Sequence, residues 1–238
     1  MKLSKRLETV ASMVTKGNRA ADVGCDHGFV PIFLVESGIS PLAVAADVRP
    51  GPLSRAKEHI KEHRLEEKIQ TRLSDGLANI KPGEADSLIM SGIGGILMMR
   101  LLQDEEHTAK SFKELILSPQ SELFDVRRYL VSNGYLIEYE HMLCDEGKYY
   151  FIFHVLVKKD EREWSEEEYR YGKDICKDDM KTFLAYLEKE ERQYEQILEK
   201  MKQAPENDRA AQRIAQLHQD ITCLKKHRQL VYDCGCFA

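Results

Sequence analysis

The sequence predicts an α/β protein with a mostly parallel sheet that has an antiparallel edge, followed by an α-helical hairpin with a coiled-coil-like seam. Short apolar runs alternate with amphipathic stretches through the first part of the chain, as in folds where helices connect parallel strands. The early runs are continuously apolar, which is typical of strands covered by helices on both faces. Beyond residue 160, apolar residues recur instead at helical spacings.

Composition sets the size and the class of the protein. The chain has 238 residues, 42% hydrophobic and 32% charged, so we expect one sizeable α/β domain and an appendage. No stretch approaches the ~18 uninterrupted apolar residues of a membrane span. The first residues, MKLSKRLETVASMV, lack the apolar core of an export signal, so we expect a cytoplasmic protein. A net charge of −5 argues against binding nucleic acid through bulk positive charge, but is compatible with a local basic patch.

The elements of the first domain follow from their periodicity. Residues 2–14 place Leu3, Leu7 and Val10 on one face of a helix, which ends near Gly17. The final two strands alternate apolar and polar residues and are joined by the turn CDEGK, which predicts a hairpin. The strands are expected at 20–24, 42–48, 69–73, 85–92, 114–119, 135–143 and 149–159, and the helices between them at 29–37, 52–63, 95–103 and 122–133.

The charge run KKDEREWSEEE marks the expected domain boundary. We therefore expect a first domain over residues 1–160, including the N-terminal helix, and a helical domain over 161–238. Two series of apolar residues, separated by the turn QAPEND, predict an antiparallel hairpin of two helices. The first series is Met180, Phe183, Leu184, Leu187, Tyr194, Leu198 and Met201, and the second is Ala211, Ile214, Leu217, Ile221, Leu224 and Val231.

Five of the predicted strands end in short turns that carry polar residues and glycines. Open parallel sheets bind ligands at the carboxyl ends of their strands, near the point where the strand order reverses. The sequence therefore predicts a ligand site there. In chain order the residues are Asp22, Gly24, Cys25, Asp26, His27 and Gly28, then Asp47, then Asp75 and Gly76, then Ser91, Gly92, Ile93, Gly94 and Gly95, and finally Ser118, Pro119 and Gln120.

The first of these turns distinguishes between two nucleoside cofactors. A dinucleotide-binding fold has G-x-G-x-x-G, whose amides hold a pyrophosphate, but here Asp26 stands where the middle glycine is expected. A carboxylate repels a diphosphate and suits the cationic sulfonium of S-adenosylmethionine, which is therefore the better fit. Gly24 permits a sharp turn, Asp47 suits the two ribose hydroxyls, and Asp75 suits the adenine amino group.

Seven segments of the chain resemble one known family. They are LSKRLETVA, ADVGCDHGFVP, GPLSRAKEHI, SDGLANIKPGEAD, SGIGG, LSPQ and DEGKYY. In matching order, and together with the helical segment YGKDICKDDMKTFLAYLEKEERQYEQILEKMK, they are similar to the bacterial tRNA (adenine(22)-N1)-methyltransferases, the TrmK family. The resemblance implies a class I methyltransferase fold, S-adenosylmethionine as methyl donor, N1 of adenine 22 in tRNA as acceptor, and a coiled-coil C-terminal domain.

The chain departs from the family pattern at three places. The family often has Ala-Tyr-Leu where this chain has Gly28-Phe29-Val30, and it usually has methionine in place of Ile93. Neither of these changes alters the expected chemistry. The family often has glutamate where this chain has Asp47, so we expect the shorter side chain to lie closer to the ribose or to bind it less well.

The chemistry of adenine N1 and the resemblance together suggest the roles of the site residues. The base becomes cationic as N1 gains a methyl group, so a nearby carboxylate stabilises the charge or accepts the amine proton. We expect Asp26 to act in this way, with His27 orienting the carboxylate or the substrate. Expected cofactor contacts are Asp22, Gly24, Cys25, Asp47, Val48, Asp75, Gly76 and Ser91. Expected substrate contacts are Gly92, Ile93, Gly94, Gly95, Phe29, Lys5 and Arg6.

Recognition of tRNA adds further expectations. N1 lies on the Watson–Crick edge, so the adenine must turn outward into the pocket; Phe29 either stacks on it or packs in the core. The helical hairpin is interpreted as an arm that contacts tRNA, and no stable protein partner is expected. The candidate RNA-binding cations, each of which also suits an ordinary solvated helix face, are Lys2, Lys5, Arg6, Arg127 and Arg128.

Three other functions remain open from the residues alone. They are methyl transfer to another RNA, a protein or a small molecule; a nicotinamide-dependent oxidoreductase; and an RNA-binding module without catalysis. A zinc site is not expected, because the spacing of Cys223, His227, Cys234 and Cys236 is not typical of one.

Overall fold

The computed structural model describes residues 3–173, 175, 179–202 and 208–235, and it divides into two compact units, Met1–Glu163 and Trp164–Ala238. The division lies slightly after the expected boundary at residue 160. Asp160 is buried and accepts hydrogen bonds from the backbone N and Nε of Arg162 (3.0 and 2.9 Å). Arg162 in turn donates to the carbonyl of Ile137, so the start of the charge run packs with the first unit.

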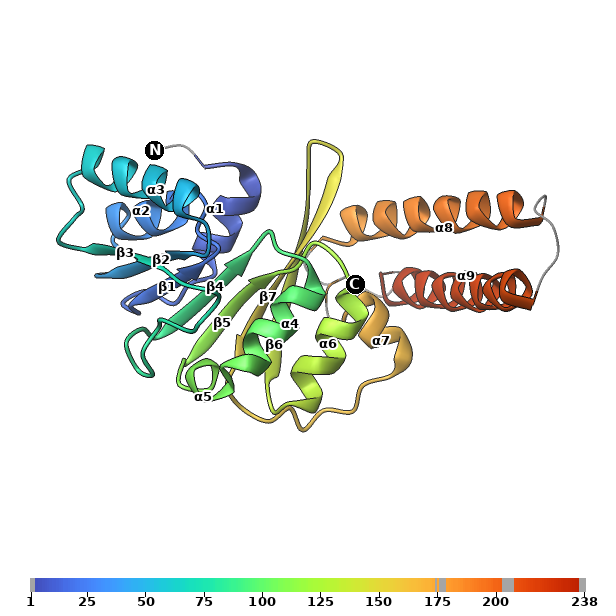
Figure 1. Cartoon of the computed structure of the whole chain (residues 1–238). Helices are drawn as coiled ribbons and strands as arrows, with labels where there is room; N and C mark the ends of the chain where they lie inside the picture. The colour runs from blue at the N-terminus through green and yellow to red at the C-terminus, as the bar shows by residue number, and fades with distance from the viewer. Residues whose placement is uncertain (1–2, 174, 176–178, 203–207, 236–238) are drawn as a thin grey trace. The chain divides into compact units, whose positions relative to one another are not determined.

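The first unit contains a seven-stranded sheet in the order β3-β2-β1-β4-β5-β7-β6 (Figure 1). The first five strands pair in parallel, whereas β7 pairs antiparallel with both β5 and β6. This confirms the predicted α/β sheet with an antiparallel edge. The strands are β1 Ala20–Val23, β2 Ala43–Asp47, β3 Ile69–Leu73, β4 Ser87–Ser91, β5 Glu114–Ser118, β6 Leu136–Asp145 and β7 Lys148–Leu156.

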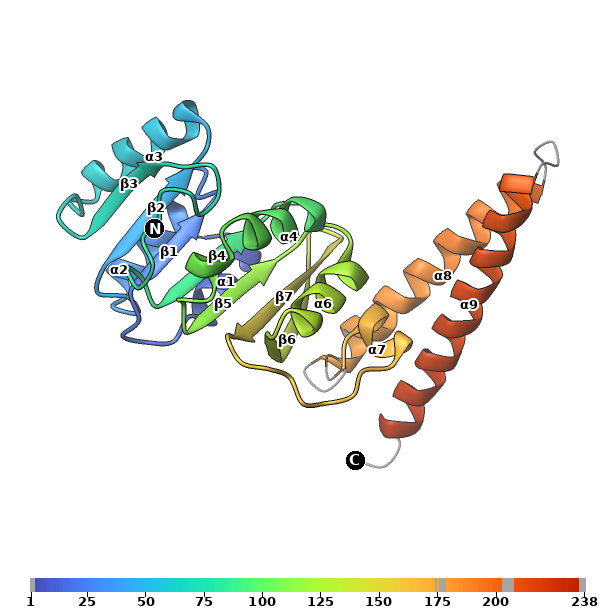
Figure 2. The ribbon, with the colours of Figure 1, turned by 60° about the horizontal axis from the view of Figure 1, so that its bottom comes forward.

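Helices cover both faces of the sheet. One apolar cluster joins side chains of α1, α2 and α3 to β1, β2 and β4, while α4 and α6 lie on the other face (Figure 2). Residues of β1, β2 and β5 are buried throughout, as their continuous apolar runs predict. The helices of the first unit are α1 Lys5–Ser12, α2 Phe29–Glu36, α3 Pro50–Glu62, α4 Gly95–Asp104, α5 Glu106–Ala109 and α6 Leu123–Ser132.

The hairpin between β6 and β7 turns at Glu146 and Gly147, which both have positive φ (49° and 75°). Two consecutive positive φ angles match the twist of a tight antiparallel hairpin. The turn predicted from CDEGK is therefore confirmed.

A buried carboxylate fixes the amino ends of the central strands. Glu114 accepts hydrogen bonds from Thr15 N (2.8 Å), Ser87 Oγ (2.5 Å), Asn18 Nδ2 (3.2 Å) and His154 Nε2 (2.9 Å). Burial raises the pKa of this carboxyl, but the hydrogen bonds, that from His154 first, outweigh burial and lower the pKa to about 2. The loop after α1 and strands β4, β5 and β7 are thus tied to one ionised group.

The second unit consists of α7 Glu166–Tyr171, α8 Met180–Lys202 and α9 Asp208–Gly235. The short α7 was not predicted, although Ser165 and Glu168 form a capping box that marks its start in the sequence. The two long helices pack together through buried residues of both predicted series, which are Phe183, Leu187, Leu198, Leu217, Ile221, Leu224 and Val231. Among the described residues no helix combines the length and apolar content that crossing a bilayer requires.

The interpretation of Arg127 as an exposed cation, either for RNA or on a solvated helix face, is wrong. Arg127 lies on the inward face of α6 with no exposed surface, beside the rings of Phe151 and Phe153. Its Nη2 donates to Oε2 of buried Glu140 at 2.7 Å, and its Nε lies 3.0–3.1 Å from both carboxylate oxygens. The neighbouring Arg128 is exposed, because consecutive helix positions point to different faces.

We expect Glu140→Ala to lower the free energy of unfolding by about 3–5 kcal/mol, because the Arg127 guanidinium would stay buried without its counterion. Urea unfolding followed by circular dichroism measures the change. Arg128→Ala is the matched control and should change stability by about 0.5 kcal/mol or less. Equal effects of the two substitutions would contradict the buried ion pair.

Candidate active site

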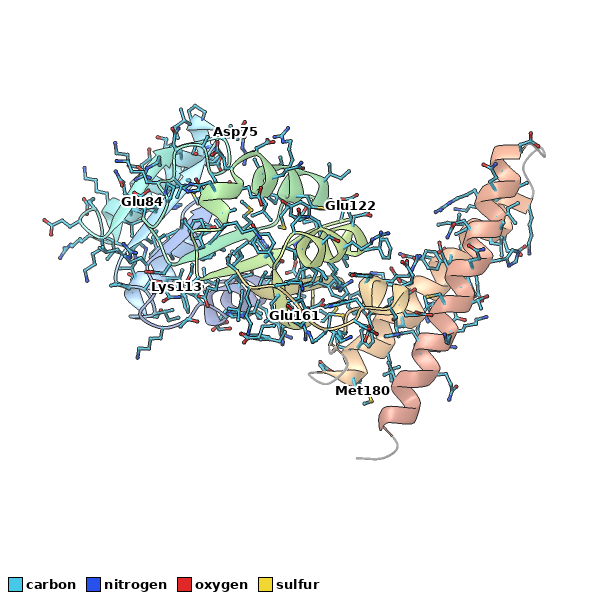
Figure 3. All side chains as sticks on the ribbon, turned by 90° about the horizontal axis from the view of Figure 1, so that it is seen from below. Asp75, Glu84, Lys113, Glu122, Glu161 and Met180 are labelled. Atoms are coloured by element: carbon cyan, nitrogen blue, oxygen red, sulfur yellow. The ribbon has the colours of Figure 1, made fainter. Side chains whose placement is uncertain are left out.

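A pocket of about 470 Å³ opens at the carboxyl ends of the parallel strands. Figure 3 labels Asp75, which follows β3 at this edge, and Lys113, which precedes β5 at the amino edge. The lining comes from α1, α2 and α4 and from residues at five strand ends. It comprises Arg6, Leu7, Asp22, Val23, Gly24, Cys25, Asp26, Phe29, Val30, Asp47, Val48, Arg49, Ser74, Asp75, Gly76, Ser91, Gly92, Ile93, Leu97, Leu101 and Gln120.

The turn after β1 holds an aspartate in an unusual backbone conformation. Asp26 has φ 48°, between Gly24 (φ 80°) and Gly28 (φ 74°). A left-handed φ is uncommon for residues other than glycine and requires support from neighbouring structure. Part of that support comes from the amides of Gly24 and Cys25, which both donate to the Ala46 carbonyl of β2 (2.9 and 3.0 Å). The Asp26 side chain is 60% exposed at the pocket.

Asp47 connects three of the strand ends. It is 3% exposed, and its two carboxylate oxygens accept from Arg49 N (2.8 Å) and Asp26 N (3.3 Å). Its carbonyl accepts from Ser74 N at 3.0 Å, at the turn after β3. The guanidinium of Arg49 lies 3.5 Å from Asp47 and 3.9 Å from Asp26, so one exposed cation faces both carboxylates.

Asp22 and Arg6 give the pocket a buried carboxyl group and a cation that acts on it electrostatically. Burial, and then the negative charge of Asp47, raise the pKa of Asp22 to about 7, while the positive charge of Arg6 opposes them. Arg6 donates from Nη1 to Ser91 Oγ at 2.5 Å, and its guanidinium lies 5.4 Å from the ring centre of Tyr150. Arg6, predicted as a substrate contact with an ordinary solvated helix face as the alternative, therefore lies in the pocket.

The turn after β4 forms the opposite side of the pocket. Gly92 has φ 83°, and a β-carbon there would lie 3.4 Å from Arg6 Nη1 and 3.6 Å from Gln120 Nε2. The backbone N of Gln120 donates to the Ile93 carbonyl at 2.9 Å, which joins the turns after β4 and β5. Because Gly92 has no side chain, the side-chain amide of Gln120 and the guanidinium of Arg6 are open to a ligand.

Most of the predicted site residues meet in this pocket, but four do not line it: Lys5, His27, Gly94 and Gly95. Lys5 is exposed on α1. His27 lies next to Asp26, with Nε2 3.6 Å from Oδ2 of that carboxylate. A β-carbon on Gly95 would lie 2.5 Å from the Ser121 carbonyl, so this glycine allows α4 to pack closely. Gly94 is the N-cap of α4.

Several lining residues were not predicted. Leu97 and Leu101 lie four positions apart on α4 and form an apolar wall, a spacing visible in the sequence. Arg49 follows Asp47 by two positions, but its link to Asp26 depends on the fold. Gln120 was recognised as a strand end without an assigned role, and only the structure places it beside Gly92.

The thiol in the pocket is not activated, and the described part of the chain holds no metal cluster. Cys25 is buried, and burial together with Asp22, Asp47 and Asp26 raises the pKa of its thiol, which keeps it protonated. No group of three or more potential metal ligands occurs among the described residues. Cys236 and the side chain of Cys234, considered for zinc, lie outside the description.

Comparison with known proteins agrees with this geometry. Residues 3–153 match the family described as "Methyltransferase domain". The tRNA (adenine(22)-N(1))-methyltransferase of Bacillus subtilis is 28% identical over 232 residues, covering 95% of this chain and 97% of the relative. The crystal structure of B. subtilis TrmK has a TM-score of 0.86 at 28% identity, covering 94% of this chain and 98% of that one.

Two further structures contain the cofactor or its product. Streptococcus pneumoniae Sp1610 in complex with S-adenosyl-L-methionine is 32% identical, with a TM-score of 0.84, and the match covers 94% of this chain and 99% of that chain. M. capricolum TrmK in complex with S-adenosyl-homocysteine is 25% identical, with a TM-score of 0.86 and coverage of 97% and 100%. Since the domain match spans more than half of the sequence and the likeness extends through both units, this chain belongs to the bacterial tRNA (adenine(22)-N1)-methyltransferase family, TrmK.

Proposed function

We propose that this protein transfers the methyl group of S-adenosylmethionine to N1 of adenine 22 in tRNA. The observation that carries the proposal is a single pocket in which the buried carboxylate of Asp47 lies next to the exposed carboxylate of Asp26. The first suits a ribose, and the second suits a base that becomes cationic. A nicotinamide-dependent oxidoreductase finds no support, because the matching family is a methyltransferase domain.

The residues of the pocket fit the chemical groups of this donor. Two backbone amides hold the carboxylate of Asp47 at the pocket. In this position its two oxygens can accept hydrogen bonds from the two ribose hydroxyls. Val48, Leu97 and Leu101 supply apolar surface for the adenine ring, with Asp75 for its amino group. When bound, the donor supplies an electrophilic methyl group on a sulfonium.

The amino-acid end of the donor carries both an ammonium and a carboxylate. We assign the ammonium to Asp22, because a buried carboxyl with a raised pKa gains most from a cation beside it. We assign the carboxylate to Arg6, whose guanidinium faces the pocket near Ser91 and Gly92. Arg6 would then select the cofactor and not the RNA.

Asp26 is the residue we propose to act on the acceptor base. Among the described residues no cation donates a hydrogen bond to its carboxylate. The nearest nitrogens are His27 Nε2 at 3.6 Å and Arg49 Nη2 at 3.9 Å, so the carboxylate oxygens are open to a ligand. The carboxylate stabilises the methylated adenine, or accepts the proton of its exocyclic amine. His27 then acts from beside the carboxylate and limits its rotation.

The acceptor adenine must leave its stack to present N1. The ring of Phe29 lines the pocket but also stacks on His27 and His59, with centroids 5.4 and 5.2 Å apart. We therefore propose that Phe29 is part of the wall against which the base packs, and that its main contact is with this ring cluster. Lys5, exposed at the start of α1, remains a candidate for a phosphate contact.

The helical hairpin is proposed to contact folded tRNA outside the pocket. The exposed lysine and arginine side chains of α8 and α9 supply charge for phosphates, although several are paired with acids: Lys225 with Glu191, for example, at 3.2 Å. A tRNA substrate also implies that the protein acts in the cytoplasm.

Mapping of the product tests the proposed function. We expect unmodified tRNA incubated with S-adenosylmethionine to yield 1-methyladenosine at position 22, detected by mass spectrometry of nuclease fragments. A transcript with guanine at position 22 is the control and should accept no methyl group. Methylation at another nucleotide, or of a protein or small molecule alone, would contradict the assigned acceptor.

Replacement of Asp26 tests its catalytic role. We expect Asp26→Asn to lower kcat by about 10²–10⁴-fold, because the variant cannot neutralise the methylated base or take its proton. Transfer of labelled methyl to tRNA measures kcat, and calorimetry should show donor affinity changed by less than about threefold. Glu62→Gln, at an exposed position on α3, is the matched control and should retain full activity. Full turnover of the Asn variant would refute the role.

The raised pKa of Asp22 predicts a pH-dependent stability in the absence of donor. The folded protein holds a proton at Asp22 up to a pKa of about 7, whereas an unfolded aspartate releases it near about 3.9. The stability supplied by this proton is therefore complete below about pH 4 and is lost as the pH rises towards about 7. Over this range, urea unfolding should show Asp22→Asn gaining stability relative to the wild type. Parallel pH profiles of the two proteins would contradict the raised pKa.

A further inference from the structure

His59 lies outside the strand ends but touches the turn that carries Asp26. It projects from α3, and its Nδ1 lies 3.0 Å from the backbone carbonyl oxygen of His27. Its ring stacks on Phe29, with centroids 5.2 Å apart and planes inclined by 17°. His59 does not line the pocket, so any effect on the reaction must pass through these neighbours.

The contact with His27 determines the protonation of the His59 ring. A backbone carbonyl oxygen only accepts hydrogen bonds, so Nδ1 of His59 must carry the proton. The tautomer of a neutral histidine is set by such a partner. The structure thus predicts that neutral His59 is the Nδ1-protonated tautomer, which spectroscopy can detect.

The hydrogen bond acts on the peptide between His27 and Gly28, one residue beyond Asp26. Asp26 has a left-handed φ of 48°, which L-residues rarely adopt, so the turn needs external support on both sides. Before the α-carbon, Asp26 N donates to Asp47 Oδ2 at 3.3 Å. After it, the carbonyl of His27 is held by His59, and Gly28 N donates to the Cys25 carbonyl at 2.8 Å.

We propose that His59 is a positioning residue for methyl transfer: its Nδ1–H fixes the His27 carbonyl and thereby the direction of the Asp26 carboxylate. The proposal rests on the proposed function, because it gives His59 an effect only on the step in which Asp26 acts. His59 touches neither the pocket nor the expected ribose ligand Asp47, so donor binding should be nearly independent of it.

Two substitutions separate the hydrogen bond from the ring. His59→Phe keeps the stack on Phe29 and removes the donor, whereas His59→Asn keeps a side-chain N–H at a similar place and removes the ring. We expect the Phe variant to lose about 3- to 10-fold in kcat with tRNA, the value of one hydrogen bond, with the KM for S-adenosylmethionine changed by less than about twofold. The Asn variant should recover most of this loss.

A matched control and a double variant complete the kinetic experiment. His63→Asn removes a histidine at the end of the same helix, which pairs with Glu36 at 2.6 Å, and should leave both constants unchanged. In the Asp26→Asn background, His59→Phe should cause no further loss of kcat, because the group it positions is gone. Equal kcat for wild type and the Phe variant, equal losses in Phe and Asn, or a full additional loss in the double variant would overturn the proposal.

Nitrogen NMR of the unmodified protein supplies a test without catalysis. At about pH 8.5, where a free imidazole is neutral, His59 should show the Nδ1-protonated tautomer, with the signal assigned by its absence from His59→Asn. An Nε2-protonated ring would overturn the proposal even if the kinetics agreed. A wild-type protein that methylates no tRNA would instead refute the proposed function, whatever the NMR result.

Discussion

The turn between β1 and α2 holds Asp26 in a left-handed backbone conformation, and the pocket depends on this turn. Its support comes from three groups on two elements: the Ala46 carbonyl and the Asp47 carboxylate of β2, and His59 of α3. Because the strained residue is held on both sides, its carboxylate has a defined direction before any ligand binds. Charged groups that are held in place before the reaction stabilise the transition state most effectively, because they need not reorient during the reaction.

The charge of the pocket follows from the same arrangement. Asp22, Asp26, Asp47 and Asp75 face a space that Arg6 and Arg49 balance only in part. Carboxylates brought together in a buried place repel each other, which is part of why the pKa of Asp22 rises. A ligand with an ammonium and a sulfonium relieves this repulsion, and so does a base that becomes cationic. The repulsion among the carboxylates of the pocket therefore favours a cationic donor and product.

Buried polar groups at the other edge of the sheet keep the strands in register. Glu114 joins the amino ends of β4 and β5 to the carboxyl end of the antiparallel β7 and to the loop after α1. The ion pair of Arg127 and Glu140 joins α6 to β6. Because β4 and β5 are parallel, fixing their amino ends in register also brings their carboxyl ends side by side at the pocket. The carboxyl edge thus carries the left-handed turn at Asp26, whereas at the amino edge the carboxylate of Glu114 is satisfied by hydrogen bonds.

The sequence by itself determined the sheet, the helical hairpin and the core of the site. Continuous apolar runs predicted the strands. A polar residue at the carboxyl end of a parallel strand lies at the binding edge of the sheet, independent of the loop that follows. The sequence could therefore place five residues together, which are Asp22, Asp26, Asp47, Asp75 and Ser91. Tertiary structure alone decided the positions of Arg6, Arg127 and His59. Their partners lie far away in the chain or on another element: 85 residues separate Arg6 from Ser91, and 32 separate His59 from His27. A long cationic or imidazole side chain suits solvent as well as a buried partner, so its direction depends on what the fold brings to it.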